Sequence, residues 1–301
     1  MAKNYETNGL YIMAKQIYEL EMANDIQLND DLDINNIMIV DGLNLAFRYK
    51  HANAESFADS YLRTVNSLAK SYGANKTIVL SDWGSSTYRL ELYPEYKGDR
   101  KERIAKQSDE EQEAFLKFIE EFNNALDLCA SQHLVLKYKG VEADDIAAYI
   151  SFWYLKKFEH DVWLISSDKD WDLLLADNIH RFSYVTRKEY RLDNWHEYYP
   201  FPHEALLHVK AIQGGKDNVK GVAGIGEKRA WQLVDKYGDV FDIHSSLPIP
   251  GKSAYINNLN NFGDKLLLNL SLMDKISHCV QAIGKENIKD IDQKLEKYLC
   301  S

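Results

Sequence analysis

Short apolar runs that lead into acidic residues constrain the fold of this chain more than any other feature. Four such runs cover residues 37–40, 78–80, 134–136 and 162–165. Asp41 directly follows the first run, and Asp82 follows the second after one serine. Short runs rich in β-branched residues and separated by helical stretches are typical of strands in a parallel sheet. The pattern therefore predicts an α/β fold built on a parallel sheet.

Acidic residues gather beyond the ends of these runs. The carboxyl ends of parallel strands share one edge of a sheet, and ligand sites form just beyond that edge. Carboxylates crowded there repel one another strongly in a low dielectric. Mg²⁺ and Mn²⁺ relieve such repulsion because they prefer carboxylate oxygens. We therefore predict a divalent-metal site with the candidate ligands Asp41, Asp82, Glu142, Asp144, Asp145, Asp168, Asp170 and Asp217.

Each of these acids, taken alone, has a simpler explanation as a helix cap or a solvated turn residue. Three acids within residues 142–145 exceed what a helix start needs, however, and Asp168 and Asp170 are spaced to direct both side chains to one point. Acids occur beyond the ends of all four predicted strands, and this repetition favours a metal site over separate roles as caps or turn residues. Two divalent ions about 4 Å apart suit the hydrolysis of a phosphodiester without a histidine base. The nine histidines fit this interpretation, because they show no ligand spacing.

The charge balance bears on the kind of partner. A net charge of −10 argues at first against a polyanion, but the candidate metal ligands account for most of it. The distribution of basic residues therefore matters more. One basic cluster consists of Lys97, Arg100, Lys101, Arg103 and Lys106, and a second consists of Lys210, Lys216, Lys220, Lys228 and Arg229.

The first cluster has two explanations. A solvated helical face is the simpler one. Its position after the second predicted strand favours a mobile bridge over the acidic site. In that bridge a lysine would neutralise the scissile phosphate, and Tyr96 would stack on a base.

A glycine-rich string at residues 221–230 is the second strong motif. Its loop is formed by Gly224, Ile225 and Gly226, with Lys228 and Arg229 beside it. Backbone N–H groups exposed before a helix bind phosphate. The string is not a P-loop, because a glutamate separates the last glycine from the lysine and no hydroxyl residue follows. It is similar to the helix–hairpin–helix element that binds one DNA strand without reading its sequence.

Four regions divide the chain. We expect an N-terminal extension at residues 1–35, an α/β core at 36–199, a helical module at 200–260 and a helical tail at 261–301. Strands are expected at residues 37–40, 77–80, 134–138, 162–166 and 181–185, with a hairpin return at 190–192. Ser108 and Glu111 predict a capping box at the start of a long helix.

The absence of long apolar runs and the small number of cysteines bear on the cellular compartment in which the chain acts. No apolar run approaches the roughly 18 residues that a membrane helix needs. The three cysteines are odd in number and far apart, so they form neither a disulfide framework nor a metal knuckle. We therefore expect a cytoplasmic protein without a membrane partner.

The motifs together resemble those of the flap endonuclease, or 5′-to-3′ exonuclease, family, and its bacteriophage members most of all. They occur in the family's order over most of the chain. The matching segments are residues 41–45, 81–82, 94–98, 141–145, 167–172 and 217–218, followed by the glycine string.

The resemblance implies a PIN-like core, a helical arch at residues 94–125 and a helix–three-turn–helix DNA-binding module. It implies a monomer that uses Mg²⁺ or Mn²⁺ to cleave DNA near 5′ flaps, branches or free 5′ ends in replication or repair. Matched by motif, the first ion is expected at Asp41, Asp82, Glu142, Asp144 and Asp145, and the second at Asp168, Asp170 and Asp217.

The resemblance also implies roles for basic residues. The expected catalytic cations are Lys97, Arg100 and Lys210. The expected DNA contacts are Arg48, Tyr96, Lys101, Arg103, Gly224, Ile225, Gly226, Lys228 and Arg229. Some family members bind a monovalent cation in the glycine loop, which makes K⁺ a further candidate ion.

One departure concerns the second ion. The family usually has G-D-x-x-D-N before the glycine string, whereas this chain has Gln213-Gly214-Gly215-Lys216-Asp217-Asn218. Either Gly214 replaces an aspartate or the loop has lost a residue, so we expect the second ion to be held more weakly.

The same departure supports an alternative function, a branched-DNA-binding protein that has lost turnover. A PIN-type ribonuclease is a third hypothesis, which the helix–hairpin–helix motif disfavours.

Overall fold

The computed structural model describes residues 35–52, 54–100, 106–155, 158–215 and 217–300. Residues 35–299 of these ranges belong to one compact unit. Most of the expected N-terminal extension, part of the expected arch, and the candidate DNA contacts Lys101 and Arg103 lie outside the described residues. Within the described ranges, no helix combines the length and apolar composition that crossing a bilayer requires.

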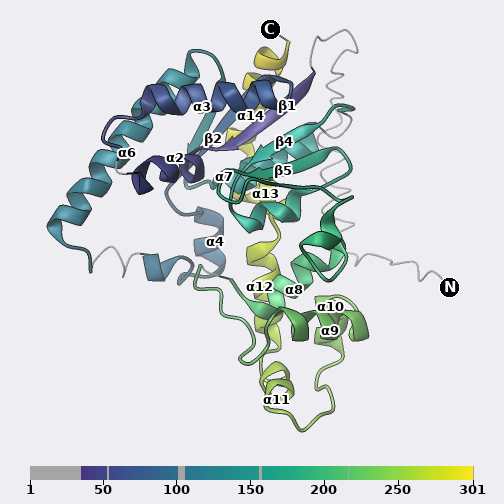
Figure 1. Cartoon of the computed structure of the whole chain (residues 1–301). Coiled ribbons are helices and arrows are strands. Elements are labelled where there is room, and N and C mark those ends of the chain that lie inside the picture. The colour runs from purple at the N-terminus through teal and green to yellow at the C-terminus, as the bar shows by residue number, and fades with distance from the viewer. Residues whose placement is uncertain (1–34, 53, 101–105, 156–157, 216, 301) are drawn as a thin grey trace. The chain divides into compact units, whose positions relative to one another are not determined.

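A six-stranded sheet organises this unit (Figure 1). Its strands are β1 (Asn36–Asp41), β2 (Ala74–Trp83), β3 (Leu134–Lys139), β4 (Val162–Ile165), β5 (Ile179–Ser183) and β6 (Lys188–Tyr190). They lie in the order β3-β2-β1-β4-β5-β6; all neighbours pair in parallel except β6, which is antiparallel to β5. The parallel sheet predicted from the sequence is confirmed.

The burial of the two central strands explains why each appears in the sequence as a continuous apolar run. Residues 37–40 of β1 and 162–165 of β4 are buried throughout. A strand covered by helices on both faces needs apolar side chains at successive positions rather than at alternate ones. The continuous runs in the sequence are the direct result.

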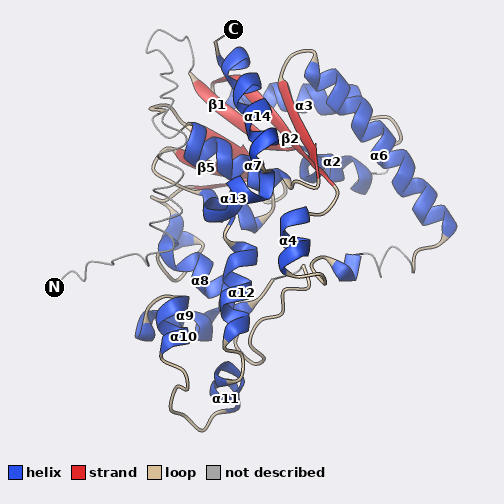
Figure 2. Cartoon of the chain, turned by 180° about the vertical axis from the view of Figure 1, so that it is seen from behind, coloured by secondary structure: helices blue, strands red, loops and turns tan. Residues whose placement is uncertain are grey.

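Helices cover both faces of the sheet. On one face lie α2 (Gly42–His51), α3 (Ala58–Ser71) and α6 (Asp109–Ala130), which share a hydrophobic core with β1, β2, β4 and β5. On the other lie α7 (Ala143–Tyr149), its π-helical continuation η1 (Ile150–Tyr154), α13 (Lys275–Ile283) and α14 (Lys285–Leu299) (Figures 1 and 2). The predicted capping box at the start of α6 is present, with Ser108 and Glu111 in the expected roles.

The remaining elements complete the unit and build a second hydrophobic core. They are α4 (Thr87–Leu92), η2 (Lys169–Leu174), η3 (Trp195–Glu197), η4 (His203–Ala205), α8 (Leu206–Gln213), α9 (Glu227–Tyr237), α10 (Val240–Ser245), α11 (Ala254–Asn260) and α12 (Asp264–Met273). Helices α8 to α12 lie together below the sheet in Figure 1. Their shared core includes Ile212, Leu233, Ile243 and Leu266, each less than 9% exposed.

The strand order fixes where a ligand site can form. From β1 the chain moves outward through β2 and β3, and it then returns to the other side of β1 with β4. Connections therefore leave the carboxyl ends of β1 and β4 in opposite directions. A crevice opens at such a switch point, and open α/β sheets bind ligands there.

Candidate functional site

Two predicted metal ligands lie at the switch point between β1 and β4. Asp41 ends β1 and caps α2, because its carboxylate accepts a hydrogen bond from the backbone N–H of Asn44 at 3.3 Å. The Ser166 hydroxyl donates to Asp41 Oδ2 at 2.8 Å and accepts from the backbone N–H of Asp168 at 3.1 Å. One hydroxyl therefore joins the acids that follow two neighbouring strands.

Asp82 connects the end of β2 to the acidic segment at the start of α7. Its Oδ1 accepts a hydrogen bond from the backbone N–H of Ala143 at 2.6 Å. In that same segment, Glu142, Asp144 and Asp145 each have a carboxylate oxygen within 4.8 Å of the others. The acids from β1, β2, α7 and the turn after β4 therefore gather at one edge of the sheet.

Burial and crowding make the charged form of these acids costly. Burial raises the pKa of Asp41 well above its usual range, and the carboxylates of Asp82 and Asp168 raise it further. Burial also raises the pKa of Asp82 to about 6, with a further contribution from Asp144. Burial, followed by the nearby Asp170, raises the pKa of Asp168. A bound cation would stabilise carboxylates in this condition.

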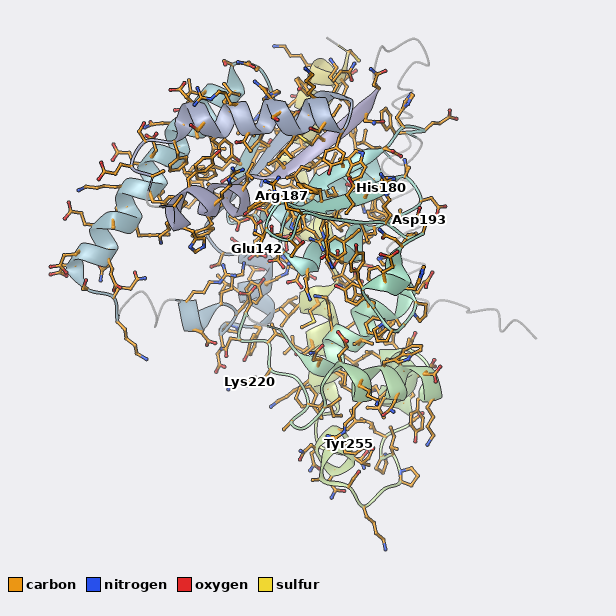
Figure 3. All side chains as sticks on the ribbon, viewed as in Figure 1. Glu142, His180, Arg187, Asp193, Lys220 and Tyr255 are labelled. Atoms are coloured by element: carbon orange, nitrogen blue, oxygen red, sulfur yellow. The ribbon has the colours of Figure 1, made fainter. Side chains whose placement is uncertain are left out.

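Glu142 lies at the junction between the sheet and the helices below it (Figure 3). Side-chain donors surround its carboxylate. Its Oε1 lies 2.8 Å from Lys97 Nζ. Its Oε2 accepts from the Tyr96 hydroxyl at 3.1 Å and lies 3.3 Å from Lys275 Nζ. Burial alone would raise the pKa of Glu142, but Lys275, Lys97 and Arg89 together outweigh burial and lower it. Glu142 is therefore held as a carboxylate.

A buried arginine from α4 holds Asp145. The two terminal nitrogens of Arg89 donate to the two carboxylate oxygens of Asp145 at 2.6 and 2.7 Å, and neither side chain is exposed. Such a bidentate pair uses both oxygens of the acid. The sequence carries no signal of this role for Arg89, because its partner is 56 residues away.

The acids predicted for the second ion contact the predicted catalytic cations. Asp170 Oδ1 lies 2.5 Å from Lys210 Nζ. Asp217 Oδ1 lies 2.6 Å from Arg100 Nη2, and its Oδ2 lies 3.8 Å from Lys97 Nζ. Lys97 therefore contacts acids predicted for both ions. Asp170 and Lys210 therefore belong to the group of acids around Asp168, whereas Asp217, Arg100 and Lys97 belong to the group around Glu142.

Tyr96 has a different role from the one predicted. The ring is only 4% exposed, and its hydroxyl donates to Glu142 at 3.1 Å. This burial leaves no ring face on which a base can stack, so the structure does not support that part of the prediction. The contact instead fixes the position of Glu142.

The backbone conformation of Gly214 bears on why this chain departs from the G-D-x-x-D-N pattern of the family. It follows α8 with a positive φ of 81°, and a Cβ there would lie 2.2 Å from the backbone nitrogen of Gly221. The same loop is closed by a hydrogen bond of 2.8 Å from the backbone N–H of Gly215 to the carbonyl of Val219. An aspartate at residue 214 does not fit without backbone movement. The geometry therefore favours a shortened loop over a simple replacement of aspartate by glycine.

The glycine loop lies between α8 and α9 and has an exposed turn. Gly224 has a positive φ of 82°, and Gly226 is the N-cap residue of α9. Arg229 donates to the carbonyl of Gly224 at 2.6 Å, and its guanidinium lies 4.8 Å from the centre of the Tyr255 ring. Lys228 is exposed. Arg229 therefore stabilises the loop, whereas Lys228 faces solvent.

Arg48 borders a cavity next to the acids at the switch point. It is exposed on α2 and lines a cavity of about 530 Å³ together with Asn44, Ser167 and Arg187. Asn44 and Ser167 are immediate neighbours of the acids at the switch point. The cavity that Arg48 lines therefore lies next to the acids at the switch point.

The donor set fits hard divalent cations. Among the described residues, no ion pair reaches Asp41, Asp82 or Asp168, which accept hydrogen bonds from neutral groups only. Asp82 and Asp168 each accept through Oδ1 only, and each oxygen of Asp41 accepts a single hydrogen bond, so all three carboxylates keep lone pairs for a metal ion. Oxygen-rich, anionic sites of this kind suit Mg²⁺ and Mn²⁺.

Comparison with known proteins identifies the family. A family model described as the 5′-3′ exonuclease, N-terminal resolvase-like domain, matches residues 36–199. The flap endonuclease of Escherichia phage T5 is 47% identical over 252 residues, which cover 83% of this chain and 86% of that protein. The chain belongs to the 5′-3′ exonuclease family. A 5′-3′ exonuclease of Bacillus subtilis is also similar, with 24% identity over 89% of this chain and 84% of its own length.

Solved structures of the 5′-3′ exonuclease family share the fold. The T5 5′-exonuclease with bound zinc ions matches with a TM-score of 0.85 and 44% identity, over 88% of this chain and 100% of that one. A T5 flap endonuclease in a pseudo-enzyme–product complex with DNA and metal ions matches with a TM-score of 0.84 and 43% identity, over 89% and 100%. These matches confirm the predicted α/β fold class and, separately, the resemblance to the family.

Proposed function

We propose that this chain is a divalent-metal-dependent, structure-specific 5′ nuclease that hydrolyses DNA phosphodiesters as a 5′-flap endonuclease and 5′-3′ exonuclease. The observation that carries this proposal is the gathering of Asp41, Asp82, Asp144 and Asp168 at the switch point of the sheet. Membership of the family supports it, since a 47% identical relative is a flap endonuclease. DNA is the proposed substrate, which is supported by the T5 flap endonuclease in its pseudo-enzyme–product complex with DNA.

Two Mg²⁺ or Mn²⁺ ions are the proposed cofactors. Of the acids predicted for the first ion, we assign Asp41, Asp82 and Asp144 as its ligands, and we assign the second ion to Asp168, Asp170 and Asp217. When bound, such ions supply an activated water and stabilise the leaving oxygen. Glu142 and Asp145 are saturated by Lys97 and Arg89, so we infer that they support the site rather than ligate an ion directly.

The catalytic cations act on the scissile phosphate in this proposal. Lys97 and Arg100 now contact Asp217, from which a phosphate of the substrate would release them. Fixed positive charge beside the phosphate stabilises the charge that develops during cleavage. Lys210 keeps Asp170 in place through their contact at 2.5 Å.

Helices α8 to α11 form the proposed helix–three-turn–helix module. Backbone N–H groups of Gly224 and Gly226, with the exposed Lys228, would bind a phosphate of the duplex. The N–H of Ile225 donates to the carbonyl of Val222 at 3.0 Å, so Ile225 shapes the loop instead. We assign Arg229 to the support of this loop and retain K⁺ as a candidate ion within it. Arg48 is proposed to contact DNA beside the cavity that it lines, and Lys101 and Arg103, which lie outside the described residues, are kept as proposed DNA contacts because of the resemblance to the family. Contacts of this kind position DNA without reading its sequence.

The second ion is proposed to bind more weakly than the first, because the loop after α8 supplies one carboxylate, that of Asp217, where the family pattern has two. A calorimetric titration with Mn²⁺ in the absence of DNA tests this point. We expect two binding events whose affinities differ by at least about tenfold, a difference of about 1.4 kcal/mol. Two events of equal affinity would refute it.

A reducing intracellular compartment, the cytoplasm, is the proposed site of action. Cys129 and Cys279 are buried free thiols rather than members of a disulfide. Disulfides are rare where glutathione and thioredoxin keep thiols reduced. We propose that the chain acts there as a monomer in DNA replication or repair.

A labelled 5′-flap DNA incubated with the protein and Mg²⁺, and resolved by size, tests the proposed function. We expect cleavage near the junction by the parent chain and at least about a thousandfold loss with Asp82→Asn, because a ligand of the first ion is removed. Binding of the flap should remain. Asp59→Asn, an exposed acid on α3, is the matched control and should cleave normally. Binding without cleavage by the parent would favour the alternative, a branched-DNA-binding protein.

A further inference from the structure

Lys275, which the proposed function does not use, lies inside the acidic site. Its side chain is 6% exposed. Its Nζ lies 2.9 Å from Asp144 Oδ2 and 3.3 Å from Glu142 Oε2. Lysine is almost never fully buried unless it is paired. Here its two partners are the proposed metal ligand Asp144 and the supporting acid Glu142.

The position of Lys275 is fixed by the fold. It is the first residue of α13, and the preceding Asp274 caps that helix by accepting from the backbone N–H of Ser277 at 2.9 Å. Arg89 binds the same segment by donating to the carbonyl of Leu272 at 2.9 Å. Helix α13 packs against α7, as both views show (Figures 1 and 2). The ammonium is therefore held in the site by helix packing.

The acids of the site differ in whether a cation of the chain is paired with them. Each of the three acids at the start of α7 has its own cation: Asp145 pairs with Arg89, Glu142 with Lys97, and Asp144 with Lys275. The acids on the strand side, Asp41, Asp82 and Asp168, accept hydrogen bonds only from neutral groups within the described residues. The α7 half of the site is therefore neutralised by the chain itself.

A fixed positive charge at this place has two opposite effects. Without metal it offsets the repulsion between Glu142 and Asp144 and keeps them in one arrangement. With metal it opposes any divalent ion that shares the remaining oxygen of Asp144, because two positive charges then lie only a few ångströms apart at low dielectric.

We propose that Lys275 is a resident counter-cation of the metal site, a positioning residue that preorganises Glu142 and Asp144 and lowers the affinity for divalent ions. The proposal rests on the proposed function only in requiring that divalent ions bind beside Asp144. It makes the metal requirement of this chain a property of its C-terminal helices as well as of its strand ends.

The test uses the full chain with Lys275→Met, which removes the charge but keeps the length of the side chain. Mn²⁺ affinity is measured by calorimetry without DNA. We expect the Met variant to bind Mn²⁺ at least about tenfold more tightly than the parent. We also expect its Tm to be lower than that of the parent in EDTA and to approach it in saturating Mn²⁺, since the ion replaces the missing charge.

The matched control is Lys289→Met on α14, an exposed lysine that pairs with Glu286 at 3.4 Å. It makes the same change of net charge away from the acids and should leave Mn²⁺ affinity unchanged within about twofold. Should the Met variant fail to fold without metal, Lys275→Gln retains a donor toward Asp144 and should show the same tighter binding.

The outcomes separate this inference from the proposed function. Unchanged or weaker Mn²⁺ binding in both Lys275 variants, with Tm lowered equally in EDTA and Mn²⁺, would mean that Lys275 merely anchors α13 and would overturn the inference alone. A parent that binds Mn²⁺ but cleaves no flap would defeat the proposed function alone. A parent that binds no Mn²⁺ would defeat both.

Discussion

At the scale of single residues, the acids fall into two groups that their sequence context does not distinguish. Asp170 and Asp172 belong to one short acidic run, yet only Asp170 lies with the candidate ligands, through Lys210. Asp172 is buried in the core, where it binds Arg181 at 2.5 Å and Tyr199 at 2.6 Å. The partner of each acid, rather than its position in the run, decides whether it faces the site.

The raised pKa of Asp82 predicts how the stability of the metal-free protein depends on pH. The pKa of Asp82 is about 6 in the folded chain and 3.8 as its ordinary value, so the folded state holds a proton that the unfolded state has released. Its contribution to stability is therefore present below the lower value and is lost as pH rises through about 6. We expect this group to lower the free energy of unfolding by about 2 kcal/mol between pH 4 and pH 7.

Urea unfolding in EDTA at a series of pH values checks this expectation. Asp82→Asn should lack this part of the pH dependence, so the difference between parent and variant should change with pH in the stated direction. Saturating Mg²⁺ should suppress the decline in the parent, because it favours the charged form. A difference that is constant with pH would contradict the assigned pKa.

At the scale of elements, α3 begins with a cap supplied from elsewhere in the chain. The residue before it, Phe57, makes no side-chain cap. Instead Glu121 of α6 accepts hydrogen bonds from the backbone N–H groups of Phe57 at 2.8 Å and Ala58 at 3.0 Å. A helix start leaves such N–H groups without partners inside the helix. The carboxylate therefore fixes α3 to α6 over one face of the sheet.

Replacement of this cap gives a prediction about stability. Glu121→Gln should lower the free energy of unfolding by about 1–2 kcal/mol, because hydrogen bonds to a charged acceptor become hydrogen bonds to a neutral one. Glu120→Gln changes an exposed neighbour on the same helix and is the control. Chemical denaturation measures both variants, and equal effects would show that Glu121 does not act as a cap.

The loop after α8 gives a second prediction at this scale. Gly214→Ala should lower the free energy of unfolding by at least about 2 kcal/mol, because φ is positive and the new Cβ meets the backbone of Gly221. Gly98→Ala is the control, since its nearest contact would be an ordinary 3.8 Å to Asn218 Nδ2. Urea denaturation distinguishes the two, and a fully stable Gly214→Ala would refute the close approach of the two backbones.

At the scale of the whole molecule, the parts predicted from the sequence are those with a local cause. Buried strands require continuous apolar runs, and the capping box lies within four residues, so both are visible in the linear pattern. The convergence of the acids follows from the topology of a parallel sheet. These rules are enough to place the candidate site at the strand ends.

The rest depends on contacts between distant segments. Lys275 is 133 residues from Glu142, and Arg89 is 183 residues from the carbonyl of Leu272 that it binds. No periodicity or spacing links such pairs, because helix packing alone brings them together. For the same reason the burial of Tyr96 and the tight loop at Gly214 could not be predicted, although both residues stood out in the sequence.

The proposed reaction depends on carboxylates from separate segments that hold divalent ions in one place. Anomalous scattering from crystals of the protein soaked in Mn²⁺ tests this most directly. We predict two peaks about 4 Å apart, as two-metal phosphodiester hydrolysis requires, the stronger among Asp41, Asp82 and Asp144 and the weaker beside Asp168 and Asp170. Mn²⁺ peaks that lie away from these carboxylates, or none at saturating Mn²⁺, would contradict the account.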